Sequence, residues 1–337
     1  MPTVSSELHP LPPPAIEVDD LVKTYGEVEA VRGVSFTVAR GEVFGFLGPN
    51  GAGKSTTINM LCTLARPTSG TARVNGFDVV PERDDVRRHI GLVFQDPTLD
   101  GQLTATQNLR LHAELYDIDP GAIPARMDQM LEMVDLTDRR DQPVMTFSGG
   151  MKRRLEIARG LMHSPRVLFL DEPTIGLDPQ TRSAIWRYVR ALQEREGTTI
   201  FMTTHYMDEA EFCDRIAIMD RGEIVVLDTP EALKASVGAD RVAVGTQDDD
   251  AALNALRDRF GIEATIAEGA ATIFDASGEA VVPRLFAELG VEITSVAVSR
   301  PTLDEVFMRY TGTTIRDAEA TPGRERSAMQ VFSKAGQ

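Results

Sequence analysis

The chain has 337 residues, of which 42% are hydrophobic and 26% are charged, and this composition is typical of folded globular proteins and excludes fibrous and wholly disordered ones. Acidic residues number 51 against 35 basic ones, giving a formal net charge of −16. A diffuse negative surface disfavours non-specific nucleic-acid binding, which needs clustered basic side chains facing phosphates. We therefore expect no nucleic-acid partner.

The two ends of the chain differ in composition from the rest. Residues 1–15 lack Lys and Arg and contain Pro12, Pro13 and Pro14, so we expect a disordered leader and no signal peptide. Residues 313–337 are polar and aperiodic and are expected to form a flexible tail. No run of 18 apolar residues occurs, so no membrane-spanning helix is predicted. Only two cysteines are present, which favours a cytosolic setting.

Strands and helices alternate along residues 16–240, which indicates an α/β domain. The apolar run at 43–47 predicts a strand buried on both faces, followed by a helix from Lys54 to about Leu64. Two further buried strands are predicted at 167–170 and 199–203. Residues from about 100 to 165 are predicted to form a mostly helical subdomain.

The pattern restarts on a smaller scale over residues 241–312. Its order is strand, helix, strand, strand, helix, strand, which fits a small α+β domain of the ferredoxin-like type. A last helix should begin at Thr302, whose hydroxyl can cap it while Glu305 reaches back. This part has no glycine-rich loop, so it is expected to be non-catalytic.

A phosphate-binding loop follows the first buried strand. The P-loop pattern comprises Gly48, Pro49, Asn50, Gly51, Ala52, Gly53, Lys54 and Ser55, and Thr56 continues it. Glycines allow backbone N–H groups to converge on phosphate oxygens, and the following helix directs its positive end at them. Lys54 is expected to reach the β and γ phosphates of ATP, and Ser55 to bind Mg²⁺. The alternative is a plain glycine-rich turn.

Two carboxylates, Asp171 and Glu172, end the predicted strand at 167–170. In a P-loop fold such a strand end lies beside the phosphate loop. Asp171 is expected to hold Mg²⁺, as acids at this position do in nucleotide hydrolases. Glu172 is expected to orient or deprotonate the attacking water. An acidic turn is the alternative for both residues.

A second candidate phosphate cradle consists of Ser148, Gly149 and Gly150, placed directly before an apolar-periodic helix. It offers a hydroxyl, bare backbone N–H groups and a helix N-terminus. A simple N-cap is the alternative.

Taken in order, these motifs resemble the ATP-binding subunit of an ABC transporter over residues 16 to about 240. The resemblance implies a P-loop ATPase cassette, with a mixed sheet and a helical subdomain, in which two copies close head to tail over two ATP molecules. Ser148 of one copy then faces the ATP held by the P-loop of the other.

The resemblance also implies roles for four further residues. Tyr25 would stack on adenine, and Gln95 would sense the γ-phosphate and Mg²⁺. His205 would contact the γ-phosphate, and Asp178 would reach across the dimer interface. The alternatives are an edge tyrosine, a polar loop residue, a structural histidine and a turn-forming aspartate.

Within the family, Phe147-Ser148-Gly149-Gly150-Met151 followed by Lys152, Arg153 and Arg154 is similar to the drug-resistance exporter branch, as is the C-terminal segment 300–307. This implies an ATPase that powers export of hydrophobic compounds, bound to the cytoplasmic face of the membrane through a separate permease subunit. An importer ATPase, or an exporter of lipid, polysaccharide, sodium or metal, is the alternative. An ATPase acting on ribosomes or DNA is disfavoured, because the chain has one P-loop and no long coiled coil.

Overall fold

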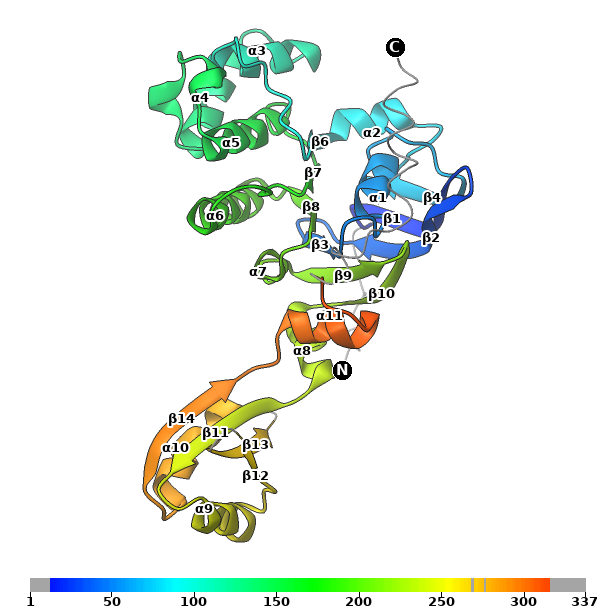
Figure 1. The fold of residues 1–337 in the computed structure, drawn as a ribbon. Coiled ribbons are helices and arrows are strands. Elements are labelled where there is room, and N and C mark those ends of the chain that lie inside the picture. Colours follow the sequence, from blue (N-terminus) through cyan, green and yellow to red (C-terminus); the bar gives the residue numbers. More distant parts are fainter. Residues whose placement is uncertain (1–12, 268–269, 276, 316–337) are drawn as a thin grey trace, which may run out of the picture. The chain divides into compact units, whose positions relative to one another are not determined.

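A computed structural model describes residues 13–267, 270–275 and 277–315, which divide into two compact units, 13–227 and 228–315 (Figure 1). This division lies earlier in the chain than the predicted boundary after residue 240. Helix α8 (Pro230–Val237) contacts α11 (Leu303–Thr311), which ties the start of the second unit to its end.

The predicted leader and tail fall largely outside the described residues. Ala15, which was assigned to the leader, is buried, and its N–H donates to the carbonyl oxygen of Val38 at 2.8 Å. Ala15 therefore belongs to the folded part of the chain, one residue before the predicted start at residue 16.

The larger unit is built on a six-stranded sheet with the order β10-β9-β3-β8-β7-β6. Five neighbouring strands of this sheet run parallel to one another, namely β9, β3, β8, β7 and β6. The carboxyl ends of these strands therefore meet at one edge. The strands are β3 (Val43–Leu47), β6 (Ile90–Val93), β7 (Val167–Asp171), β8 (Thr199–Thr204), β9 (Arg215–Asp220) and β10 (Glu223–Asp228). The predicted strands at 43–47, 167–170 and 199–203 are confirmed.

A second, antiparallel sheet has the order β2-β1-β4-β5 and was not predicted as a separate layer. Its strands are β1 (Ile16–Tyr25), β2 (Val28–Val38), β4 (Ser69–Val74) and β5 (Phe77–Asp78). One buried core joins the two sheets, with Phe36 from β2 packed among Phe44, Phe46 and Phe201. Ring centroids in this group lie 4.9–6.0 Å apart, a spacing typical of stacked and edge-to-face pairs.

The helices of the larger unit form two sets. Helices α3, α4 and α5 contact one another and form the helical part of the unit (Figure 1). Helices α1, α2 and α7 contact strands of the two sheets, and α6 contacts α5. Their bounds are α1 (Lys54–Leu61), α2 (Arg83–His89), α3 (Ala105–Leu115), α4 (Ile123–Met133), α5 (Gly149–Gly160), α6 (Pro179–Glu196) and α7 (Met207–Ala210).

The smaller unit contains a four-stranded antiparallel sheet with the order β12-β13-β11-β14, which confirms the predicted ferredoxin-like order. Its elements are β11 (Asp240–Thr246), α9 (Asp249–Ala255), η3 (Leu256–Phe260), β12 (Thr265–Ala267), β13 (Ala270–Asp275), α10 (Gly278–Glu288) and β14 (Ile293–Ser299). Val242, Val244 and Ile273 pack with α9 and α10 in its core. Thr302 and Glu305 form the predicted capping box of α11.

Across the described ranges of both units, no helix combines the length and the apolar character that crossing a bilayer requires.

Candidate active site

The P-loop connects β3 to α1 with the backbone geometry that a phosphate cradle needs. Gly51 and Gly53 have φ angles of 87° and 105°, which side-chain-bearing residues rarely adopt. A Cβ on Gly53 would lie 2.5 Å from the carbonyl oxygen of Ala30, and one on Gly48 would overlap that of Met219. Both positions therefore require glycine, and the loop leads directly into the start of α1.

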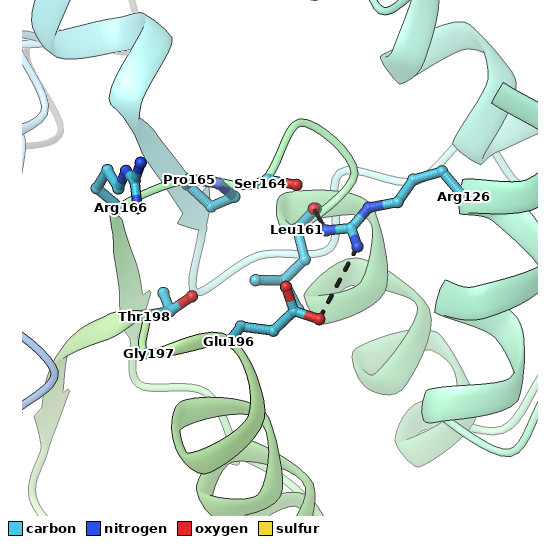
Figure 2. Close-up of a pocket in the computed structure, with 8 residues that line it drawn as sticks. All are labelled: Arg126, Leu161, Ser164, Pro165, Arg166, Glu196, Gly197 and Thr198. Carbon is cyan, nitrogen blue, oxygen red and sulfur yellow. Dashed lines mark hydrogen bonds and ion pairs between the residues drawn. The ribbon is translucent and has the colours of Figure 1, made fainter. Parts of the chain in front are cut away.

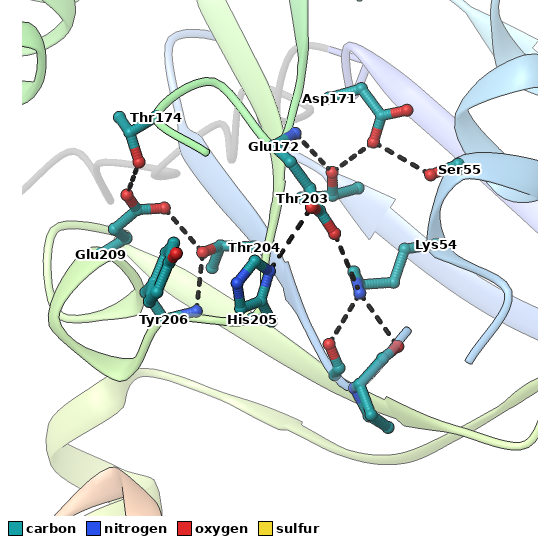
Figure 3. Close-up of polar contacts among 12 residues, drawn as sticks. Lys54, Ser55, Asp171, Glu172, Thr174, Thr203, Thr204, His205, Tyr206 and Glu209 are labelled. Atoms are coloured by element: carbon teal, nitrogen blue, oxygen red, sulfur yellow. Dashed lines mark hydrogen bonds and ion pairs between the residues drawn. The ribbon is translucent and has the colours of Figure 1, made fainter. Parts of the chain in front are cut away.

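Lys54 begins α1 and is 96% buried. Its Nζ donates to the carbonyl oxygens of Gly48 at 2.6 Å and Pro49 at 3.0 Å (Figure 3). The same Nζ lies 3.4 Å from Oε1 of Glu172. The ammonium group therefore sits between the P-loop and the end of β7.

Asp171, the last residue of β7, is brought to the P-loop. Ser55 Oγ donates to its Oδ1 at 3.1 Å, and Thr203 Oγ1 donates to the same oxygen at 2.5 Å (Figure 3). Burial raises the pKa of Asp171, although these two hydrogen bonds oppose the rise. A cation beside Ser55 and Asp171 would favour the ionised carboxylate.

Glu172 follows with a φ of 43°, an uncommon backbone conformation for a non-glycine residue. Its N–H donates to Thr203 Oγ1 at 3.0 Å, and its Oε2 lies 3.4 Å from His205 Nδ1. Burial tends to raise the pKa of Glu172, but His205 and the charge of Lys54 outweigh this and hold the pKa below its usual value. Both neighbours therefore favour the ionised form of the Glu172 carboxylate.

The sequence pattern predicted no role for Thr203 or Glu209. Both form hydrogen bonds that fix the residues around Glu172. Glu209 on α7 accepts hydrogen bonds from Thr174 Oγ1 and, at 2.6 Å, from Thr204 Oγ1 (Figure 3). Burial raises the pKa of Glu209, opposed by the hydrogen bond from Thr204. Through these two hydrogen bonds, Glu209 links the loop that follows Glu172 to the residue that precedes His205.

The other predicted residues lie on neighbouring elements. Ser148 is the N-cap of α5 and accepts from the N–H of Met151 at 3.3 Å. This is the structural role that was given as the alternative to phosphate binding. A Cβ on Gly150 would lie 2.5 Å from Thr181 Cγ2 on α6. Gly150 therefore also permits close packing of α5 on α6. Asp178 caps α6, accepting from the N–H of Thr181 at 3.0 Å.

Gln95 follows a strand of the six-stranded sheet, and Tyr25 ends a strand of the antiparallel sheet. Gln95 is exposed just beyond β6, the neighbour of β7, so it lies on the sheet edge that carries Asp171. Tyr25 is the last residue of β1 and is 38% exposed, and the centroid of its ring lies 4.6 Å from Lys23 Nζ. A partly exposed ring of this kind is available for stacking.

The residues at this edge fit a magnesium nucleotide. The Ser55 hydroxyl and the Asp171 carboxylate are the oxygen ligands that Mg²⁺ prefers. At Gly48 and Gly53 a Cβ would clash with neighbouring carbonyl oxygens, so only glycine allows the loop conformation in which backbone N–H groups can converge on phosphates beside Lys54. Among the described residues, no group of three or more His, Cys, Asp or Glu side chains is arranged to hold a metal ion by itself.

Comparisons with known proteins agree with this geometry. A family model described as "ABC transporter" matches residues 31–175, and a model of the C-terminal domain of DrrA1-3-like ATP-binding proteins matches residues 229–311. The daunorubicin resistance ATP-binding protein DrrA3 of Streptomyces coeruleorubidus is 43% identical over 91% of this chain and 98% of its own. The chain belongs to the family of ABC transporter ATP-binding proteins.

Two other similar proteins extend the comparison. The linearmycin resistance ATP-binding protein LnrL of Bacillus subtilis (strain 168) is 39% identical over 90% of this chain and all of its own. The dimeric ATP-binding cassette MJ0796, solved after hydrolysis with ADP and Pi, superposes with a TM-score of 0.58 and 30% identity over 64% of this chain and 98% of its own. The chain is thus an ABC-type ATPase, and the predicted cassette with a small α+β domain is confirmed.

Proposed function

We propose that this chain powers an ABC exporter of drug-like or other hydrophobic compounds, with the channel supplied by a separate membrane-spanning subunit. The observation that carries the proposal is that the small unit, as well as the cassette, matches relatives named for resistance to daunorubicin and linearmycin. ATP-binding subunits of this family work with membrane permeases and dimerise. For this chain we place the resulting complex at the cytoplasmic face of the membrane.

In the proposed reaction the P-loop backbone and Lys54 bind the phosphates of ATP, and Tyr25 stacks on the adenine. Ser55 and Asp171 would hold Mg²⁺, with Gln95 at the same sheet edge, and the ion would neutralise charge that develops on the phosphates during transfer. The buried contact between Lys54 and Glu172, at 3.4 Å, supports this assignment because it sets the phosphate-binding cation beside the proposed base.

Glu172 accepts a proton from the water that attacks the γ-phosphate, and His205 contacts the γ-phosphate from the end of β8. The contact between Glu172 Oε2 and His205 Nδ1, at 3.4 Å, supports this division of roles. A general base of this kind contributes about 10²–10⁴-fold to a rate.

The site is completed by a second copy of the chain, which contributes Ser148, Gly149 and Gly150 to the phosphates and Asp178 to the interface. The exposed positions of Ser148, Gly149 and Asp178 support this. Asp178 already uses its carboxylate to cap α6, so the proposal assigns it a second role beside the structural one.

Transport in oriented membrane vesicles tests the export proposal. Inside-out vesicles that contain this chain and its membrane-spanning subunit should accumulate daunorubicin when ATP is added. Vesicles with Glu172→Gln serve as the matched control and should accumulate none, because the complex still assembles but ATP turnover is blocked. ATP-driven accumulation in right-side-out vesicles instead would indicate an importer and overturn the proposal.

A further inference from the structure

Arg153, on the second turn of α5, is 94% buried and reaches three backbone carbonyls at the edge that carries the active site. Its Nε donates to Pro173 O, and its Nη2 donates to Asp171 O at 3.1 Å. Its Nη1 donates to Phe94 O at 2.5 Å. Asp171 and Pro173 flank Glu172 in the sequence, and Phe94 directly precedes Gln95.

A buried carboxylate, Glu156, balances the charge one turn later on the same helix. Its Oε2 lies 3.0 Å from Arg153 Nη1, and it is 99% buried. Its other oxygen accepts from the N–H of Thr98 at 2.7 Å, in the same loop as Gln95. The pair therefore has hydrogen-bond partners on both sides, which a buried ion pair needs if it is not to be destabilising.

The geometry demands arginine in particular. A guanidinium directs donors from three nitrogens in one plane, so it can bind carbonyls that lie in different directions at once. A lysine ammonium carries all its donors on a single atom and cannot span the same three carbonyls.

We infer that Arg153 is a positioning residue for hydrolysis. It fixes the backbone on both sides of Glu172, and the residue before Gln95, to the helix that Ser148 begins. Arg153 acts through the carbonyls that it holds. Any shift of α5 when a second copy engages Ser148 is thereby passed to the residues that carry out hydrolysis. This inference rests on the roles proposed above for Glu172, Gln95 and Ser148.

A matched control comes from a half-buried arginine that also binds backbone carbonyls. Arg126 on α4 donates to Leu161 O at 2.8 Å and to Met162 O at 3.2 Å, and it lies 4.0 Å from Glu196 (Figure 2). These partners lie outside the proposed site. Arg126→Lys thus shows how the loss of a guanidinium affects ATP hydrolysis when the groups around Glu172 are not disturbed.

The test is steady-state ATP hydrolysis by the full-length Arg153→Lys variant. Misplacing reacting groups by about 1 Å costs up to about 100-fold, so we expect kcat to fall by about 10- to 100-fold. KM for ATP should stay unchanged, because Lys54 and the P-loop are intact. Arg126→Lys should match the wild type in both constants. Rates are normalised to the fraction of molecules that binds ATP, so partial unfolding cannot imitate the effect.

A double variant separates this inference from the proposed function. If Arg153 acts through Glu172, Arg153→Lys should cost little more once Glu172 is replaced by Gln. A full additional loss in the double variant, an unchanged kcat in the single variant, or a rise in KM alone would overturn the inference. Full activity of Glu172→Gln by itself would instead count against the proposed base.

Discussion

Replacing Glu172 by Gln is expected to lower ATP hydrolysis by about 10²–10⁴-fold, the usual effect of removing a positioned base. The amide keeps the size and much of the hydrogen bonding of the carboxylate but cannot accept the proton of the attacking water. ATP binding should survive, since Lys54, Ser55 and Asp171 are untouched. Phosphate release under single-turnover conditions measures the effect.

Asp208→Asn is the control for this variant, because Asp208 is an exposed carboxylate on the nearby helix α7. It should hydrolyse ATP at the wild-type rate. Near-wild-type hydrolysis by Glu172→Gln would show that another group activates the water. His205, 3.4 Å from Glu172, would then be the next candidate.

Lys54→Ala should act at an earlier step and weaken ATP binding itself. A hydrogen bond to a charged group contributes about 1.5–3 kcal/mol, which corresponds to about a 10- to 100-fold increase in Kd for ATP. The substitution also leaves the buried Glu172 without its nearest cation, so the pKa of Glu172 should rise. Equilibrium binding of a fluorescent ATP analogue measures the change in Kd.

Lys234→Ala removes the same charge from helix α8 of the smaller unit and should leave ATP binding as it is. Thermal unfolding of both variants establishes that they are folded. Equal affinity of the Lys54→Ala variant and the wild type would remove the P-loop lysine from the proposed site.

The centre of the site was predictable because its signals are local. The P-loop and its helix occupy one short segment, and Asp171 and Glu172 end a continuous apolar run. Parallel strands bring their carboxyl ends to one edge, so these segments were expected to meet. The contacts of Lys54 with Glu172 and of Ser55 with Asp171 follow this expectation.

Other features depend on pairings between distant segments and left no local signal. Thr203 reaches Asp171 because β7 and β8 pair in a register that sets these two residues side by side. Glu209 contacts the loop after Glu172 only because the fold brings α7 next to that loop. Neither the strand register nor the position of α7 can be predicted from hydrophobic periodicity.

Contacts between distant segments also explain why the sequence did not predict the antiparallel sheet or a second unit that starts at Asp228. Strand β4 has no long apolar alternation and is stabilised by pairing with β1, about fifty residues earlier in the sequence. The second unit begins at Asp228 because α8 packs on α11 from the far end of that unit. Arg153 was noted only as part of a basic run, and its three carbonyl partners appeared only in the fold.

The central claim is that ATP closes two copies of this chain over a shared site. The most direct test is the mass of the Glu172→Gln variant in solution, measured by light scattering with and without ATP and Mg²⁺. We predict the mass of two chains with the nucleotide and of one chain without it. Adding Lys54→Ala should restore the single-chain mass. A single-chain mass at saturating ATP would contradict the account.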